Sequence, residues 1–212
     1  GLAARSEKDP ELAQHILLKT LNGLVRQMRR ITPHHKASTW SDYAETATHY
    51  SNEDHAGKRA FISEALAQVR PARVLDVGCN TGVYSRLAAE TGAEVVSIDT
   101  DLQAVDKLAT HLKDTGLNIL PLHVDLAQPT PATGWDNRET RSFLNRATGH
   151  FDLVMMLAVI HHLLLASQVP LDQIAELSAR LTKEHLIIEW VPPTDQKFKE
   201  LLRGRDAIYT HL

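Results

Sequence analysis

The chain has 212 residues, of which 43% are hydrophobic and 23% are charged, an ordinary balance for one globular domain with a sizeable core. No apolar run approaches the roughly 18 residues that a membrane-spanning helix needs, and the formal net charge of −3 argues against nucleic acid as the default partner. The single cysteine, Cys79, cannot form an internal disulfide, so we expect a reducing, cytoplasmic location.

The N-terminal stretch predicts a basic amphipathic helix. Asp9-Pro10 supplies an N-cap and a first helical residue, and Thr32-Pro33 ends the helix after about Arg30. Residues 1–36 hold seven Lys and Arg against three acidic residues. We expect this helix to form a lid or cap over the following domain, or else a contact with a partner or a second copy of the chain.

The next region, residues 34–58, is rich in histidine and aromatic side chains. Its histidines lack Cys or acidic partners at metal-ligand spacing, so no metal site is predicted. The run from Trp40 to Tyr50 favours a lid over a substrate, and a helix is expected over 57–69. The predicted domains are an N-terminal helical lid or cap at 1–57 and a second domain at 58–212.

A strand, a glycine turn and a helix follow one another from Arg73 onward. Arg73–Val77 is predicted as a buried strand, Gly78 to Gly82 as a tight turn, and a helix begins at Val83. This arrangement holds nucleoside-bearing cofactors at the carboxyl end of a parallel sheet. A dinucleotide turn needs a third, middle glycine, which is missing here. Asp76 before the turn would repel a pyrophosphate and attract a cation, which disfavours a nicotinamide dehydrogenase and suits S-adenosylmethionine.

Two further strands also end in acidic residues. Residues 94–99 end at Asp99, about 20 residues after the glycine turn, where one carboxylate can accept both hydroxyls of a ribose. Asp101 better suits the N-terminus of a helix over 101–113. The third strand, 118–125, ends at Asp125. The pattern predicts an α/β fold, a Rossmann-like doubly wound and mostly parallel sheet with an N-terminal helical extension.

The residues Asp76, Gly78 and Gly82 resemble motif I of the class I S-adenosylmethionine-dependent methyltransferases. The resemblance implies that Asp125 contacts the adenine amino group, that an aromatic side chain closes over the methionine moiety, and that Lys58 or Arg59 meets its carboxylate. The cofactor residues predicted in this way are Tyr50, Lys58, Asp76, Gly78, Asn80, Gly82, Asp99, Asp125, Leu126 and Leu157.

Residues 126–150 are the least typical part of the chain. Their first half is a Pro- and Gly-rich loop, and their second half predicts a helix over 137–147. Trp135 and Arg138 could shape a pocket for an anionic or planar group, or Trp135 could simply pack the loop down.

The fourth predicted strand covers residues 151–157, and the segment after it carries two histidines. Its string Ala158 to Leu163 is similar to the family's segment beside the transferable methyl group. Adjacent residues on a helix point about 100° apart, so His161 and His162 cannot face a substrate equally. One could remove a proton, because imidazole titrates near neutrality; in the alternative, both only pack the loop.

The C-terminal part predicts a helix over 170–181 and a fifth strand over 185–191. Glu189 near the end of that strand could act as a second acid or base, or bind a substrate amine. A helix is expected from Phe198 to the end. The family sheet ordinarily has a sixth and a seventh strand, so we expect a truncated longer protein or, in the alternative, a reduced fold.

Together these features predict a methyltransferase that uses S-adenosylmethionine and a small-molecule acceptor, with methyl transfer to oxygen or nitrogen. The predicted catalytic residues are His161, His162 and Glu189. One alternative is an RNA or protein methyltransferase recruited by the basic N-terminal helix, and another is a cofactor-binding partner subunit without activity.

Overall fold

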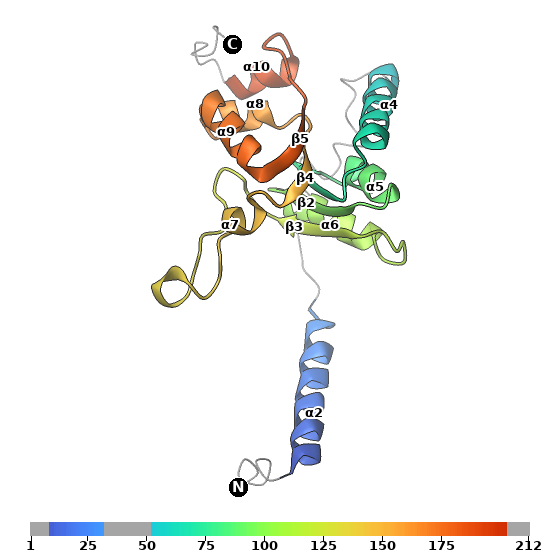
Figure 1. Cartoon of the computed structure of the whole chain (residues 1–212), viewed down its shortest axis with the longest axis vertical. Coiled ribbons are helices and arrows are strands. Elements are labelled where there is room, and N and C mark those ends of the chain that lie inside the picture. The colour runs from blue at the N-terminus through green and yellow to red at the C-terminus, as the bar shows by residue number, and fades with distance from the viewer. Residues whose placement is uncertain (1–8, 32–51, 203–212) are drawn as a thin grey trace. The chain divides into compact units, whose positions relative to one another are not determined.

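The computed structural model describes residues 9–31 and 52–202, and the chain divides into two units, residues 1–36 and 37–212 (Figure 1). Between residues 9 and 31, the described part of the first unit, lies the helix α2 (Pro10–Met28), none of whose residues is buried. Its start is as predicted: the Asp9 carboxylate accepts hydrogen bonds from the backbone N–H groups of Glu11 (3.1 Å) and Leu12 (3.2 Å).

In the second unit, residues 52–202 contain a five-stranded sheet in which every pairing is parallel, in the order β3-β2-β1-β4-β5. This confirms the predicted α/β fold. The strands are β1 (Arg73–Val77), β2 (Glu94–Asp99), β3 (Ile119–His123), β4 (Phe151–Met156) and β5 (Thr182–Ile188). The α-helices are α4 (Asn52–Val69), α5 (Val83–Glu90), α6 (Leu102–His111), α7 (Phe143–Ala147), α8 (Ile160–Leu165), α9 (Leu171–Leu181) and α10 (Gln196–Leu202).

Side-chain alternation along the central strands divides the core between the two faces of the sheet. Leu153 and Met155 of β4 pack in the cluster that α4 and α5 supply. Val154 and Met156 point the other way, into the cluster that contains residues of α7, α8, α9 and α10. Both faces are therefore covered, as expected for a parallel sheet whose strands are apolar along most of their length.

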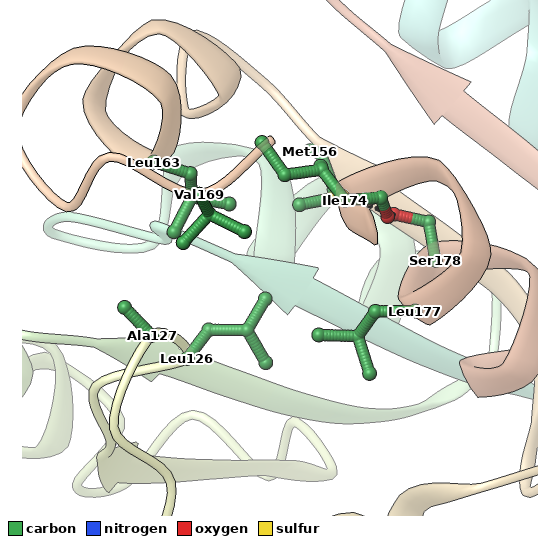
Figure 2. Close-up of a pocket in the computed structure, with 8 residues that line it drawn as sticks. All are labelled: Leu126, Ala127, Met156, Leu163, Val169, Ile174, Leu177 and Ser178. Atoms are coloured by element: carbon green, nitrogen blue, oxygen red, sulfur yellow. Dashed lines mark hydrogen bonds between the residues drawn. The ribbon is translucent and has the colours of Figure 1, made fainter. Parts of the chain in front are cut away.

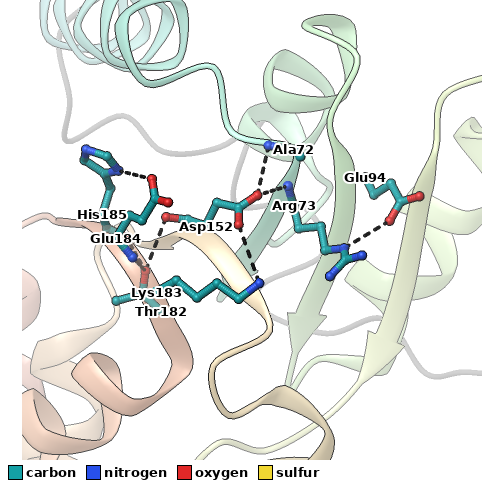
Figure 3. A network of polar contacts seen from close by, with 8 residues as sticks. All are labelled: Ala72, Arg73, Glu94, Asp152, Thr182, Lys183, Glu184 and His185. Atoms are coloured by element: carbon teal, nitrogen blue, oxygen red, sulfur yellow. Dashed lines mark hydrogen bonds and ion pairs between the residues drawn. The ribbon is translucent and has the colours of Figure 1, made fainter.

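The amino-terminal edge of the sheet is tied together by Asp152 of β4 (Figure 3). Its carboxylate accepts hydrogen bonds from the backbone N–H groups of Ala72 (3.0 Å) and Arg73 (2.9 Å), at the start of β1. The ammonium of Lys183 at the start of β5 lies 3.9 Å from the same carboxylate. These contacts fix three strand starts in register and leave the opposite, carboxyl-terminal edge for the site.

The predicted helix over 137–147 is wrong in its first half, because α7 begins only at Phe143. Thr133 and Thr140 instead form an antiparallel bridge, with a short 3₁₀ turn between them at Trp135–Asn137. Asn137, where the predicted helix would begin, has a φ of 55°, in the left-handed region, through which an α-helix cannot continue. The side chain of Trp135 at this turn is 85% exposed, so it does not pack the loop down.

Two other predicted boundaries are corrected. The fifth strand begins at Thr182 and ends at Ile188, three residues earlier at each end than predicted, so Glu189 follows the strand. Its backbone N–H still donates to the carbonyl of Met156, which extends the β4–β5 ladder by one bond. Helix α4 begins at Asn52, before the predicted start at Gly57. Within the described residues, no helix has the length and apolarity to cross a membrane.

Candidate active site

The glycine turn between β1 and α5 is anchored on the neighbouring strand. The backbone N–H groups of Gly78 and Cys79 both donate to the carbonyl of Ile98 in β2, at 2.8 and 3.0 Å. Gly78 and Gly82 have φ angles of 70° and 77°. L-amino acids with side chains rarely adopt this conformation, so the two glycines of the motif are required by the backbone itself.

The glycine turn also packs against the loop after β4. A Cβ atom placed on Gly78 would lie only 2.3 Å from Cγ2 of Val159, two residues before His161. At Gly82 the same atom would lie 2.4 Å from the side chain of Leu108 in α6. Absence of a side chain at residue 78 therefore brings the turn and the histidine-bearing loop into contact.

The carboxylate of Asp99 is held at the end of β2 by two backbone donors. One oxygen accepts the N–H of Asn80 in the glycine turn, and the other accepts the N–H of Asp101, both at 2.8 Å. Partial burial raises the pKa of Asp99, and these two hydrogen bonds oppose that effect. Each carboxylate oxygen can accept more than one bond, so this fixed group keeps acceptor capacity for a pair of hydroxyls.

Asp76 lies beneath the turn, with only 2% of its surface exposed. The hydroxyl of Ser85 donates to its carboxylate at 2.6 Å, and the hydroxyl of Ser97 donates in turn to Ser85 at 2.8 Å. Burial raises the pKa of Asp76 to about 6, although the Ser85 bond and the charge of Lys58 act in the opposite direction. No sequence pattern singles out these two serines. Ser85, for example, lies nine residues after Asp76, a spacing that predicts no contact between the two side chains.

Asp125 and Leu126, the two predicted residues after β3, have different surroundings. One oxygen of Asp125 accepts the backbone N–H of Ala127 at 2.8 Å, which is the local cap that a strand-terminal Asp often makes. Leu126 is buried and lines a small apolar pocket with side chains of β4, α8 and α9 (Figure 2). The residues around this pocket are Leu126, Ala127, Met156, Leu163, Val169, Ile174, Leu177 and Ser178.

Lys58 and Glu189, which were predicted for different roles, form an ion pair. The ammonium of Lys58 in α4 lies 2.5 Å from a carboxylate oxygen of Glu189, just after β5. It also lies 5.0 Å from the centre of the Tyr84 ring in the first turn of α5. No sequence pattern selects Tyr84, since only the fold brings residues 58, 84 and 189 together.

The two histidines lie on α8 with their ring centres 4.2 Å apart. His161 is buried, and its Nδ1 atom has no hydrogen-bond partner among the described residues. Burial, followed by the neighbouring His162, lowers the pKa of His161 to about 4, so this imidazole is neutral at pH 7. His162 is only partly buried.

We expect His161→Leu to stabilise the protein by about 1 kcal/mol, because it removes a buried nitrogen atom without a partner while keeping a similar volume. The measurement is urea unfolding at pH 7 of the variant and of the unaltered protein. A loss of more than about 1 kcal/mol would instead show that the imidazole makes a polar contact that stabilises the fold.

Leu157 is buried at the end of β4, in the cluster with α4 and α5. Cys79 is buried in the glycine turn, and burial raises the pKa of its thiol above the ordinary range, which supports a packing role rather than a nucleophile. Tyr50 lies outside the described residues.

Known proteins are similar to this chain in sequence and in fold. A family model described as a methyltransferase domain matches residues 48–203. The nodulation protein NoeA of Rhizobium meliloti (strain 1021) is 36% identical over 176 residues, 82% of this chain and 36% of NoeA. A ubiquinone biosynthesis O-methyltransferase of Caulobacter sp. (strain K31) is 23% identical over 150 residues, 62% of this chain and 54% of the relative.

Among solved structures, monomeric WbdD matches with a TM-score of 0.53 and 19% identity, over 76% of this chain and 36% of WbdD, which concerns the fold alone. The chain thus spans about a third of NoeA and about half of the ubiquinone enzyme. The match to the family model covers most of the chain, including the glycine turn and the acids at the strand ends. The chain belongs to the class I S-adenosylmethionine-dependent methyltransferase family.

Proposed function

We propose that this protein transfers the methyl group of S-adenosylmethionine to an oxygen or nitrogen atom of a small-molecule acceptor. The observation that carries the proposal is the carboxylate of Asp99, held by the N–H groups of Asn80 and Asp101 at the end of β2. A carboxylate fixed in this way matches a ribose diol. The buried charge of Asp76 beneath a turn without a middle glycine suits a cationic cofactor that has no phosphate.

The strand order supports one direction for the bound cofactor. With the ribose at Asp99 of β2, Asp125 after β3 receives the adenine on one side. The amino-acid end then extends the other way, across the glycine turn after β1 and toward β4 and β5. The cofactor supplies the reactive methyl group when bound, and the chain supplies binding and orientation.

For the acceptor side we propose His162 as the proton acceptor. His161 is neutral and buried with a pKa near 4, so it is a weak base at neutral pH, and its neighbour is the more accessible imidazole of the pair. An acceptor hydroxyl is favoured by the similarity to a ubiquinone biosynthesis O-methyltransferase.

A cytoplasmic location and a lid formed by residues 1–57 over the domain at 58–212 belong to the same proposal.

Calorimetric titration with S-adenosylhomocysteine tests the cofactor assignment, with NAD as a parallel probe. We expect binding of the first alone, and a loss of about 10- to 150-fold in Asp99→Ala, which removes charge-assisted hydrogen bonds worth about 1.5–3 kcal/mol. Asp106→Ala on the exposed side of α6 is the matched control and should bind normally. Equal affinity of the Asp99 and Asp106 variants would refute the ribose role.

A second candidate is a macromolecular acceptor recruited by α2, whose Lys19 and Arg26 are exposed, as are Arg29 and Arg30 just after it. Charge-driven recruitment of RNA would weaken steeply as salt is raised. Methylation assays with a quinol-type phenol and with bulk tRNA, each at two salt concentrations, separate the two candidates. A protein that binds the cofactor but turns over neither acceptor would favour a non-catalytic partner subunit.

A further inference from the structure

Lys58, Tyr84 and Glu189 form a cluster at the carboxyl-terminal edge of the sheet. They come from three separate elements: helix α4, the first turn of α5 and the residue after β5. The Lys58 ammonium is held from two sides, by the Glu189 carboxylate at 2.5 Å and by the face of the Tyr84 ring at 5.0 Å. An ammonium over an aromatic face is attracted by the ring, so both contacts favour one position of a long, flexible side chain.

The cluster lies where the amino-acid end of the cofactor is directed. The edge of the sheet presents Asp125, Asp99 and the glycine turn in the order β3, β2, β1, and Glu189 lies beyond them, after β5. Tyr84 is two residues after Gly82, which ends the turn. The charge of Lys58 is also felt by Asp76 under the turn, where it favours the ionised carboxylate.

The ion pair is accessible and has donors to spare. The side chains of Lys58 and Glu189 are 26% and 24% exposed, so an anion can reach the ammonium from solvent. An ammonium has three N–H donors, and within residues 9–31 and 52–202 Glu189 takes up one of them. The lysine side chain has many rotamers. Because Lys58 is already held in one position before the ligand binds, binding costs less side-chain entropy.

We propose that Glu189 is a positioning residue, which holds the ammonium of Lys58 over the Tyr84 ring so that it receives the carboxylate of the cofactor's amino-acid end. This inference rests on the proposed function and gives Glu189 a role different from acid–base catalysis. It assigns Tyr84 to the site as the surface on which the ammonium rests. Glu189 then affects affinity for the amino-acid end and leaves the adenosine end unchanged.

Two probes separate the ends of the ligand. S-adenosylhomocysteine carries the amino-acid end, whereas methylthioadenosine has the same adenosine thioether without it. For Glu189→Gln we expect calorimetry to show about a tenfold loss of affinity for the first probe and less than a twofold change for the second. Glu94→Gln, which removes an exposed ion pair with Arg73 at the opposite edge (Figure 3), is the matched control and should change neither affinity.

A double-variant cycle tests whether Glu189 acts through Lys58. Lys58→Met alone should cost about 10- to 100-fold in affinity for S-adenosylhomocysteine. Adding Glu189→Gln to that variant should cost nothing further, because no ammonium is left to position. Independent, multiplying losses would overturn the inference, as would equal losses for both probes. If the unaltered protein bound neither probe, the proposed function itself would fail; binding unaffected by Glu189→Gln would reject only the positioning role.

Discussion

Replacing Gly78 by alanine is expected to cost about 2–5 kcal/mol of stability and to abolish measurable cofactor binding. The φ of Gly78 is 70°, a left-handed conformation that costs an alanine about 1–2 kcal/mol. The added Cβ would also meet Cγ2 of Val159 at 2.3 Å, and overpacking of this kind costs about 1–3 kcal/mol. Valine is stiff at χ1, so relief of the clash must move the loop that leads to His161.

Urea unfolding of three variants separates the two contributions. Val159→Ala in the Gly78→Ala background removes the clashing methyl group but leaves the backbone strain, so about half of the lost stability should return. Val159→Ala alone supplies the reference for its own loss of packing. If the double variant were no more stable than Gly78→Ala, the contact between the turn and the β4–α8 loop would not be the source of the loss.

Most strands of the fold could be predicted from the sequence alone. Short apolar runs, three of them with an acid at or near the end, predicted the first four strands to within two residues, because a buried parallel strand leaves a continuous apolar signal. The fifth strand was predicted to begin three residues late, because Thr182, Lys183 and Glu184 are polar and only the pairing with β4 reveals them as strand. The bridge between Thr133 and Thr140, with its 3₁₀ turn, was missed because residues 137–147 were expected to form the helix that ordinarily connects two parallel strands.

Some residues of the candidate site could be predicted from the sequence, and others could not. Asp76, Asp99 and the two glycines form a local pattern around a single turn, so spacing along the chain suffices to find them. The Lys58–Glu189 pair joins residues 131 positions apart, and the Ser97–Ser85–Asp76 chain links two strands and a helix. No local pattern predicts such contacts, because they depend on how the helices lie on the sheet.

The buried carboxylate of Asp76 should make the free protein less stable at neutral pH than an Asp76→Asn variant, by about 1–3 kcal/mol. Burial raises the pKa of Asp76 from the ordinary value of 3.8 to about 6, a difference that corresponds to about 3 kcal/mol. Above pH 6 the folded protein bears this whole penalty, because the carboxylate is charged both folded and unfolded. Asparagine keeps an oxygen that can accept the Ser85 hydrogen bond, and it carries no charge.

The pH dependence has a definite sign. As the pH falls from 6 toward 4, the folded protein binds a proton on Asp76 before the unfolded chain does, so this group's penalty disappears. The stability advantage of the asparagine variant should therefore shrink over this interval and be nearly lost at pH 4. Urea unfolding of both proteins between pH 4 and 8 measures the difference directly, since other titrating groups are common to the pair. A constant difference across this range would contradict a pKa near 6.

Cofactor affinity should change in the opposite direction to stability. The Asp76 carboxylate destabilises the free protein, but it should attract the ammonium group of S-adenosylhomocysteine. Functional sites often cost stability in this way. S-adenosylhomocysteine should bind the asparagine variant about tenfold more weakly at pH 7.5, and its affinity for the unaltered protein should fall as the pH drops below 6. The variant should lack that fall, because it has no carboxyl to protonate at this position. Equal affinities of the unaltered protein and the asparagine variant at pH 7.5 would mean that the Asp76 charge does not contribute to cofactor binding. The charge would then serve the fold alone, although its raised pKa shows that it costs stability.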